Sequence, residues 1–402
     1  MSVRGGEKVR GGKMKVALVC DWLVTVGGAE KVLLKLHQMY PEAPIYTSKY
    51  DPRGIDWFKE ADVRTGFLQK FPNFLRKLIG PLRQRYFSRL DLSEYDLIIS
   101  VTGAEAKAVK SGRWRAAHGE PTKNPRGIHI SYCHVPTQYY WQMYDTYMEN
   151  PGFGVLNPLV RMVLRLSVKR LRRADLVAAE RPDYYITISE YARKMIKRYY
   201  GREAVVINPA VEVGDFAKVG KEMRKHRGGK KNDKTNEYYV TSSRQVNWKR
   251  LDIAVKAASE LGRKLIVIGE GPEHRELVRE AGDSIEFLPL MKKKELAEKL
   301  AGAKGYLFPS LEPFGIAPVE ALAAGCPVIA YGEGGALDYV KDGENGILFR
   351  PQTVEGLARG IKKFEKCKFD REGVARTAER FSEKRFEKEI REFIKKCGGK
   401  NG

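Results

Sequence analysis

The sequence predicts an α/β protein with two domains, each built on a doubly wound sheet of parallel strands. Short apolar runs that fit buried strands alternate along the chain with segments of helical periodicity, and this alternation is typical of parallel sheets. The chain has 402 residues, which is long for a single hydrophobic core. Hydrophobic residues make up 43% of the chain, a share that supports globular folding.

The predicted strands are continuous apolar runs, and ligands of such sheets bind where the strands end. In the first half of the chain the runs are Val16–Cys20, Leu97–Val101, Ile128–Cys133 and Tyr184–Ile188. In the second half they are Tyr238–Thr241, Leu265–Ile268, Ile285–Leu288, Gly305–Phe308, Pro327–Ala330 and Gly346–Phe349. Helical patterns between them include Leu251–Leu261, Lys293–Ala301 and Thr353–Phe364.

Composition shifts suggest where the domains begin and end. We expect a disordered tail over residues 1–13, which are Gly-rich and basic and lack the apolar core of a signal peptide. The first domain is predicted at 14–207 and the second at 208–378, followed by a C-terminal helical segment at 379–402. Residues 218–237 are rich in Lys, Arg, Gly and Asn, which predicts a mobile surface loop.

Composition also argues against a membrane-spanning protein and against a disulfide-linked or zinc-binding one. No apolar run approaches the ~20 residues needed to span a bilayer. The five cysteines show no Cys-x-x-Cys spacing, which favours reduced cytoplasmic thiols over disulfides or a zinc site. The net charge of +23 indicates an anionic partner, such as nucleic acid, acidic lipid or a phosphorylated substrate.

The most informative stretch follows the run that ends at Phe308. A turn at Pro313–Gly315 leads into a predicted helix at Ile316–Ala324, and a helix N-terminus after a strand is a natural anion site. Glu312 and Glu320 flank this site at a separation of at most about 12 Å. That spacing suits two hydroxyl-rich groups on either side of a diphosphate, as in a nucleotide sugar. For the pair alone, a surface helix with a solvated glutamate is the far more common explanation.

Other short elements follow predicted strands, and each also has a simpler structural explanation. Gly27 and Gly28 open a helix and let backbone approach an anion. Arg244 and Lys249, five residues apart, can converge on one diphosphate, although a solvated basic turn has the same composition. His134 follows Ile128–Cys133, where many histidines have only a structural role.

These elements together resemble a known family. Glu312-Pro-Phe-Gly-Ile, followed by Glu320-Ala and Ala324-Gly-Cys-Pro-Val-Ile-Ala, resembles the C-terminal signature of retaining glycosyltransferases of family 4. The resemblance covers most of residues 14–395. It implies the GT-B fold, in which two Rossmann-like domains face each other across a cleft and a C-terminal helix crosses back onto the first domain.

The resemblance assigns expected roles to individual residues. Glu312 would contact the donor sugar, Glu320 the ribose, and Arg244 with Lys249 the leaving diphosphate. His134 would lie near the transferred sugar. The implied catalytic residues are His134, Arg244, Lys249 and Glu312. The implied donor-binding residues are Gly27, Gly28, Arg244, Lys249, Gly269, Leu290, Glu312, Phe314, Gly315, Ile316 and Glu320. From its position after the first strand alone, Asp21 is predicted to face the acceptor.

Residues Tyr132–Tyr147 and Arg173–Gly201 narrow the resemblance to a subgroup that transfers mannose in O-antigen and lipid-linked glycan assembly. This implies transfer from GDP-mannose to a glycan or polyprenyl-linked acceptor, with no cofactor and no essential metal. Two alternatives stay open. One is a sugar-nucleotide epimerase or hydrolase of similar fold. The other is a nucleic-acid binder, which the charge suggests but for which no recognised module is present.

Two basic stretches suggest contact with a membrane. Phe67–Leu90 and Pro158–Arg173 each contain six Lys or Arg and no acidic residue. We expect them to lie on anionic lipid, which places the protein in the cytoplasm at the inner face of the cell membrane. The simpler alternative for each is a core helix with a solvated basic face.

Overall fold

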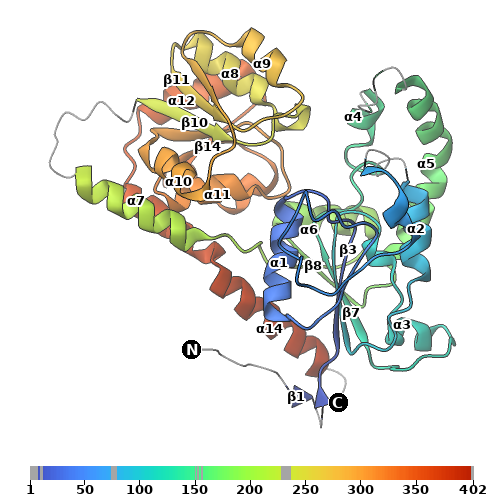
Figure 1. Ribbon diagram of the computed structural model, residues 1–402. Coiled ribbons are helices and arrows are strands. Elements are labelled where there is room, and N and C mark those ends of the chain that lie inside the picture. Colours follow the sequence, from blue (N-terminus) through green and yellow to red (C-terminus); the bar gives the residue numbers. More distant parts are fainter. Residues whose placement is uncertain are drawn as a thin grey trace. The chain divides into compact units, whose positions relative to one another are not determined.

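The computed structural model describes residues 8–9, 12–73, 79–149, 151, 154, 157–227 and 237–399. Contacts divide the chain into two compact units, Met1–Ile207 (unit 1) and Asn208–Gly402 (unit 2). Each unit contains a parallel sheet with helices packed against it, so the predicted α/β class is confirmed (Figure 1).

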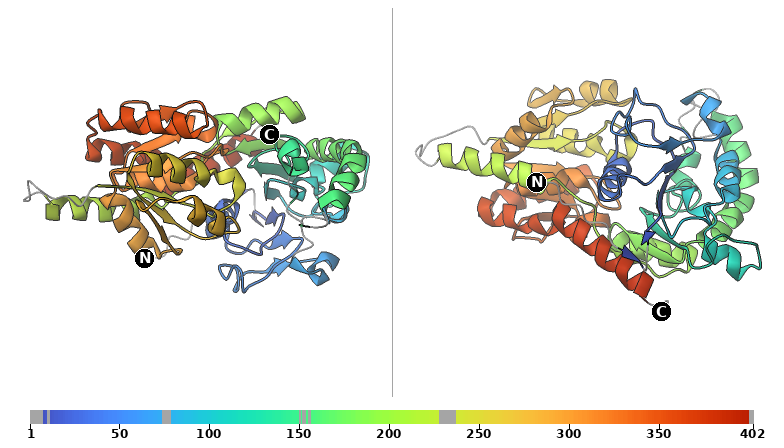
Figure 2. Two further views of the ribbon diagram at one scale, coloured as in Figure 1. Left: turned by 90° about the horizontal axis from the view of Figure 1, so that it is seen from above. Right: turned by 60° about the horizontal axis from the view of Figure 1, so that its bottom comes forward.

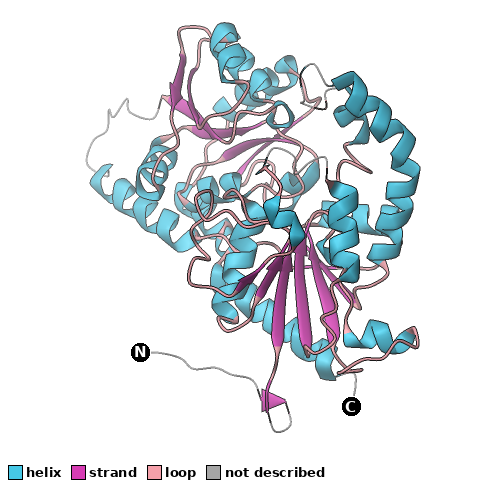
Figure 3. Ribbon diagram, turned by 45° about the vertical axis from the view of Figure 1, so that its right-hand side comes forward, coloured by secondary structure: helices cyan, strands magenta, loops and turns pink. Residues whose placement is uncertain are grey.

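Unit 1 is built on a sheet of seven parallel strands. The strands are β3 (Val16–Cys20), β4 (Ile45–Thr47), β5 (Val63–Arg64), β6 (Leu97–Thr102), β7 (Ile128–Cys133), β8 (Tyr184–Thr187) and β9 (Val205–Val206). Their order is β5-β4-β3-β6-β7-β8-β9, and Figure 3 shows them fanned by the usual sheet twist. β3, β6 and β7 are buried throughout, because helices cover both faces of a parallel sheet.

Serine side chains cap the starts of two helices of unit 1, α3 (Gly112–Ala117) and α6 (Glu190–Tyr200). Ser111 and Ser189 accept hydrogen bonds from the first turns of α3 and α6, and Gly201 ends α6 in a left-handed conformation. The helices are α1 (Gly28–Met39), α2 (Gly80–Arg89), α3 (Gly112–Ala117), α4 (Tyr144–Glu149), α5 (Asn157–Ala179) and α6 (Glu190–Tyr200). In the predicted disordered tail, β1 (Lys8–Val9) and β2 (Gly12–Lys13) pair antiparallel, and the other residues before Lys13 lie outside the described ranges.

Unit 2 is built on six parallel strands. The strands are β10 (Tyr238–Ser242), β11 (Lys264–Ile268), β12 (Ile285–Leu288), β13 (Gly305–Phe308), β14 (Val328–Tyr331) and β15 (Gly346–Phe349). Their order is β12-β11-β10-β13-β14-β15, so the chain crosses to the other side of β10 after β12. All six strands match runs that the sequence predicts to within one residue at each end.

The helices of unit 2 show that part of the loop predicted over residues 218–237 is helical. They are α7 (Val213–Arg227), α8 (Leu251–Glu260), α9 (His274–Glu280), α10 (Lys293–Gly302), α11 (Ile316–Ala323), α12 (Val354–Glu365), α13 (Arg371–Thr377) and α14 (Glu383–Gly399). The loop predicted over 218–237 is wrong for 218–227, which belong to α7. Val213, Phe216 and Gly220 are buried along one face of that helix, and the basic residues around them hid this period. The remainder, 228–236, lies outside the described residues.

A buried ion pair in unit 1 corrects the interpretation of Phe67–Leu90. Arg83, on α2, has 1% of its surface exposed, and its Nε donates to Glu105 Oε2 at 2.8 Å. Its Nη2 donates to Glu105 Oε1 and to the Tyr139 hydroxyl. Arg83 is therefore a core residue and not a lipid-facing cation. Arg76 and Lys77 of the same stretch lie outside the described residues, so Arg85 and Arg89 are the exposed cations that the structure places on α2.

A second buried pair joins helix α5 to the loop after β6. Lys107 Nζ donates to Asp175 Oδ1 at 2.6 Å, and both side chains are about 1% exposed. The carboxylate of Asp175 also accepts from the Thr137 hydroxyl, the Trp141 indole N–H and the Tyr200 hydroxyl. Four donors therefore satisfy one buried carboxylate. Within the described ranges, none of the helices combines the length and apolar character needed to cross a bilayer.

We predict that Asp175→Ala destabilises unit 1 by about 3–5 kcal/mol, because it leaves the buried ammonium of Lys107 without its counter-charge. Urea unfolding followed by tryptophan fluorescence measures the change. Glu203→Ala removes the exposed partner of Lys197 and serves as the control, for which we expect little effect. Equal losses in the two variants would contradict the assignment of Asp175 as a structural hub.

Candidate functional site

The candidate site in unit 2 lies where the strand order reverses, between β10 and β13. The loops after these two adjacent strands leave toward opposite sides, and such a switch point opens a crevice at the carboxyl edge of the sheet. Lys249 follows β10 and Glu312 follows β13. The Nζ of Lys249 lies 2.6 Å from Oε1 of Glu312, and both side chains are about one-fifth exposed. The structure thus brings together two of the predicted catalytic residues, 63 positions apart in sequence.

Local structure fixes the Lys249 side of the pair. A short 3-10 helix, Asn247–Lys249, ends at Arg250, whose φ of 51° redirects the chain into α8. The Ser310 hydroxyl donates to the Lys249 carbonyl at 2.8 Å and ties the loop after β10 to the loop after β13. Arg244 is exposed, and it has no acidic partner in the part of unit 2 that the structure describes. Its guanidinium is therefore available to an anion at this edge.

Gln245 is a site residue that sequence reasoning missed. Its side chain is completely buried, its Nε2 donates to the Gly269 carbonyl at 2.6 Å, and its Oε1 accepts from His274 Nδ1 at 2.8 Å. The backbone of Gln245 also bonds to Glu270 and Glu273. A glutamine between two cations looks like a solvated residue in sequence. In the structure it locks the Arg244 loop onto the turn that follows β11.

The backbone conformation and close packing of that turn require a glycine at position 269. The φ of Gly269 is 119°, and a Cβ there would collide with the carbonyl oxygen of Ser243. The predicted turn therefore lies directly against the loop that carries Arg244. Leu290, which follows β12, is 81% exposed and stands at the same edge of the sheet.

The Glu312 side is held by a glycine-containing turn. Gly315 has a φ of 99°, and a Cβ there would lie 2.8 Å from both the Phe308 ring and the Tyr339 hydroxyl. Tyr339 donates to the Phe314 carbonyl at 2.9 Å, and Gly335 N–H donates to the Glu312 carbonyl at 2.8 Å. The turn is therefore rigid, and α11 begins directly after it at Ile316. The first N–H groups of a helix have no intrahelical acceptor and point at this edge.

Glu320 lies inside α11 with 7% of its surface exposed, so it is not a solvated helix residue. The pKa of the buried Tyr306, on β13, responds to the charge of both glutamates. Burial, and then the charges of Glu312 and Glu320, raise the pKa of the Tyr306 hydroxyl, whose proton goes to the Ser242 carbonyl at 2.9 Å. The charges of both glutamates therefore act on one buried tyrosine of β13.

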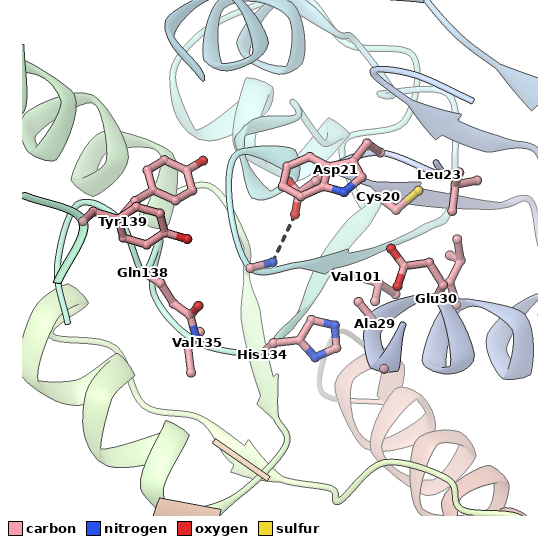
Figure 4. A pocket seen from close by; sticks show the side chains of 15 residues that line it. Cys20, Asp21, Leu23, Ala29, Glu30, Val101, His134, Val135, Gln138 and Tyr139 are labelled. Atoms are coloured by element: carbon pink, nitrogen blue, oxygen red, sulfur yellow. Dashed lines mark hydrogen bonds between the residues drawn. The ribbon is translucent and has the colours of Figure 1, made fainter. Parts of the chain in front are cut away.

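Unit 1 contains its own pocket of about 460 Å³, at the switch point between β3 and β6 (Figure 4). Asp21, Gly28 and His134, three of the predicted site residues, line it. Gly27 precedes Gly28 as the N-cap of α1. Aromatic side chains form much of the wall. The lining residues are Cys20, Asp21, Trp22, Leu23, Gly28, Ala29, Glu30, Leu33, Val101, Gly103, His134, Val135, Gln138, Tyr139 and Tyr147.

Asp21 has a clear structural role at the rim of this pocket. Its carboxylate accepts from the Thr102 hydroxyl and from the backbone N–H groups of Gly103 and Ala106, at 2.7–3.1 Å. Burial, together with the charge of Glu105, raises the pKa of Asp21. The residue therefore joins the end of β3 to the end of β6, in addition to facing the pocket.

His134 is the pocket residue best placed for contact with a ligand. Its backbone N–H donates to Thr102 O at 2.8 Å, and its ring packs edge-on against Tyr132. Nε2 is buried, and no residue within the described ranges forms a hydrogen bond with it. Burial lowers the pKa of His134 to about 4, so the ring is neutral at pH 7. Its uncharged nitrogen can exchange a hydrogen bond with a hydroxyl.

Nowhere within the described residues do three or more His, Cys, Asp or Glu side chains cluster in a way that could hold a metal ion. The polar groups of the two candidate sites are mixed cations, hydroxyls and isolated carboxylates, which suit an organic anion or a sugar.

Comparison with known proteins connects unit 2 to a family. Residues 222–387 match the family described as "Glycosyl transferases group 1". A 2-deoxystreptamine glucosyltransferase from Streptomyces kanamyceticus is 33% identical over 127 residues, which are 30% of this chain and 33% of that protein. The chain thus spans about a third of the length of the curated relatives it matches.

Solved structures are similar over nearly the whole chain. Sucrose-phosphate synthase from Thermosynechococcus elongatus is 17% identical with a TM-score of 0.67, and the match covers 97% of this chain and 100% of that one. The Anabaena protein HepE, solved in complex with UDP, is 20% identical with a TM-score of 0.66, over 95% and 100%. These likenesses confirm the predicted GT-B fold of two Rossmann-like units.

The neutral state of His134 predicts a pH dependence of stability. Unfolded histidine has a pKa near 6.5, so between about pH 6.5 and 4 the unfolded chain binds a proton that the folded ring does not. The free energy of unfolding therefore falls as the pH is lowered through this window, by up to about 1.4 kcal/mol per pH unit.

Urea unfolding at several pH values measures this slope. His134→Gln should reduce this slope by the contribution of about one proton, because the variant lacks one titrating histidine. The buried His129, whose pKa burial lowers to about 3, keeps its own contribution in that variant. A slope in His134→Gln equal to that of the unchanged protein would show that the ring already takes up its proton when folded.

Proposed function

We propose that this protein is a retaining glycosyltransferase that uses a nucleoside diphosphate sugar as donor. The observation that carries the proposal is the Lys249–Glu312 pair at the switch point of the unit 2 sheet. It combines a cation for a diphosphate with a carboxylate for sugar hydroxyls. Both residues lie within the segment that matches glycosyl transferases group 1.

In the proposed donor complex, Arg244 and Lys249 share the diphosphate, the first through its guanidinium fork and the second as a point charge. The start of α11 adds backbone N–H groups around Gly315 and Ile316. Glu312 accepts hydrogen bonds from sugar hydroxyls, and Glu320 accepts them from the ribose. Gly269 and Leu290 line the nucleotide side of the site.

The proposed chemistry breaks the bond between the anomeric carbon and the diphosphate oxygen. The acceptor hydroxyl attacks from the face that the diphosphate leaves and transfers its proton to a phosphate oxygen, so the anomeric configuration is retained. Arg244, Lys249 and the helix N-terminus stabilise the charge that develops on the diphosphate. This role needs no metal ion, and His134 contributes a neutral hydrogen-bonding group near the transferred sugar.

Two donors have specific support. The resemblance of Tyr132–Tyr147 and Arg173–Gly201 to mannosyltransferases supports GDP-mannose. The names of similar proteins favour a glucosyl donor, since one is a 2-deoxystreptamine glucosyltransferase and HepE was solved with UDP-glucose. We place GDP-mannose first and UDP-glucose second.

The acceptor that we propose is a glycan, free or carried on a polyprenyl lipid. The unit 1 pocket presents Trp22, Tyr139 and Tyr147, and aromatic faces of this kind suit the apolar side of a sugar ring. A lipid-carried acceptor requires the enzyme to work at an anionic membrane surface, which we place at the inner face of the cell membrane. This also accounts for part of the +23 net charge.

A donor screen followed by a transfer assay tests the proposal. Thermal shifts with GDP- and UDP-sugars identify the donor, and transfer to a polyprenyl-diphosphate glycan is then measured in EDTA. We expect an α-linked product from an α-linked donor. Sugar release or isomerisation without an acceptor would instead support a hydrolase or epimerase. Salt-sensitive retention of nucleic acid on filters, with no sugar-nucleotide binding, would favour the nucleic-acid binder.

The first prediction from this proposal concerns the cation. Lys249→Ala should lower kcat by on the order of 10²–10³, since one preorganised charge-stabilising donor is lost. Lys249→Arg should recover part of the rate because it keeps the charge. Arg250→Gln is the matched control, because Arg250 pairs with Asp252 and not with the site. Full activity of Lys249→Ala at saturating donor would remove this assignment.

The second prediction separates the two glutamates. Glu320→Gln should raise KM for the donor and weaken binding of the free nucleoside diphosphate. Glu312→Gln should lower kcat and leave nucleotide affinity equal or slightly higher, because it releases Lys249 from its ion pair. Calorimetric titration with the nucleoside diphosphate compares the variants. Weaker nucleotide binding in Glu312→Gln than in Glu320→Gln would show that the two roles are reversed.

A further inference from the structure

The first half of α5 exposes large apolar side chains to solvent. Leu159, Met162 and Val163 are each slightly more than half exposed, and Leu166 is 79% exposed. Their spacing of three and four residues places them on one face of the helix. In Figures 1 and 2 these first turns of α5 stand clear of the unit 1 sheet, whereas the last turns run beside α2. A stripe of this spacing normally faces a core.

Cations continue the same face of the helix. Lys169, Arg170 and Arg173 follow the apolar stripe, and all three are exposed. Leu159, Leu166 and Arg173 are seven residues apart, so at 3.6 residues per turn they lie almost in line. Among the described residues, none of the three cations has an acidic partner. No acidic residue occurs in the helix before Asp175, which is buried against Lys107.

The opposite face of α5 packs against the core of unit 1, and this packing fixes the orientation of the helix. Val168, Asp175, Ala178 and Ala179 are buried. Gln84 of α2 donates to the Ala174 carbonyl at 3.4 Å. The four donors on Asp175 fix the rotation of the helix about its own axis. The apolar and basic residues described above are therefore held outward by the core of unit 1.

We propose that this outward face of α5 docks onto an anionic lipid bilayer. Apolar side chains followed by unpaired cations match the order of the layers in a membrane surface, where acyl chains lie beneath anionic phosphates. Leu166 and Arg173 are about 10 Å apart along the helix axis, so a helix that enters the surface with its first turns holds Arg173 about that far above Leu166. The first turns of α5 then enter the acyl boundary while the three cations contact headgroup phosphates.

Charge distinguishes this occupant from a second copy of the chain. A self-complementary contact over this face would bury the cations of two identical helices, with no acidic residue of the same helix segment to compensate them. Anionic lipid supplies the missing counter-charge. The inference rests on the proposed function for its purpose, since a lipid-carried acceptor needs an enzyme at the bilayer, but its test does not depend on that function.

Co-sedimentation with vesicles tests the inference in the absence of donor and acceptor. The unchanged protein should bind vesicles of phosphatidylcholine with phosphatidylglycerol and lose this binding at ~0.5 M salt. Lys169→Gln/Arg170→Gln/Arg173→Gln should weaken the partition coefficient by on the order of 10², at about fivefold per charge. Leu159→Ser/Leu166→Ser should weaken it at least tenfold, on the order expected for loss of two inserted side chains.

A matched variant controls for overall charge. Lys123→Gln/Arg126→Gln/Lys194→Gln removes three exposed cations of unit 1 that lie outside α5, and it should bind vesicles within about twofold of the unchanged protein. Circular dichroism and thermal unfolding confirm that each variant is folded.

Several outcomes would overturn the proposal. One is an equal loss of binding in the matched variant. Others are undiminished binding by the Leu159→Ser/Leu166→Ser variant, and equal binding to vesicles of phosphatidylcholine alone. A concentration-dependent dimer that only this leucine variant abolishes, without vesicle binding, would assign the face to a second copy. A failure of sugar transfer with vesicle binding intact would instead count against the proposed function and leave the docking surface standing.

Discussion

The reversal of strand order within each sheet determines where chemistry can take place in this protein. Parallel strands all end at one edge, and right-handed crossovers send the chain to one side of β10 and then to the other. The loops after β10 and β13 therefore diverge, and the residues that follow these strands lie at the same edge of the sheet. Lys249 and Glu312 meet there for this reason, and Asp21 and His134 come to line one pocket in unit 1 for the same reason.

Buried charge holds the unit 1 pocket in shape. Arg83 and Lys107 are two of the largest fully buried side chains, and each is compensated by a carboxylate with further hydrogen bonds. Tyr139 joins the first of these networks and also lines the pocket. Removing charges from water is costly, and here the loops after β6 and β7 and helix α5 must pack together to satisfy them. These networks therefore hold Tyr139, and with it part of the pocket wall, against the core of unit 1.

The sequence revealed the central strands and the residues that follow them, because a strand buried on both faces is a continuous apolar run. It missed β4, β5 and β9, which have two or three residues each and lie toward the edges of their sheet. It also placed Arg83 in a stretch predicted to contact lipid, whereas Arg83 is buried. Nothing in a single sequence tells a buried arginine from an exposed one when its partner, Glu105, is distant in the chain. The burial of Gln245 was hidden for the same reason, whereas Glu312 and Glu320 were found because a family signature surrounds them.

The Lys249–Glu312 pair has a consequence for which anions the site accepts. A bare phosphate can reach Lys249 only by competing with a carboxylate already 2.6 Å from it, and it brings no hydroxyl for the carboxylate that it displaces. A diphosphate bonded to a sugar can satisfy both partners at once. If the site holds the proposed donor, this pair selects a diphosphate that carries a transferable sugar over free phosphate, because only the former brings sugar hydroxyls to Glu312.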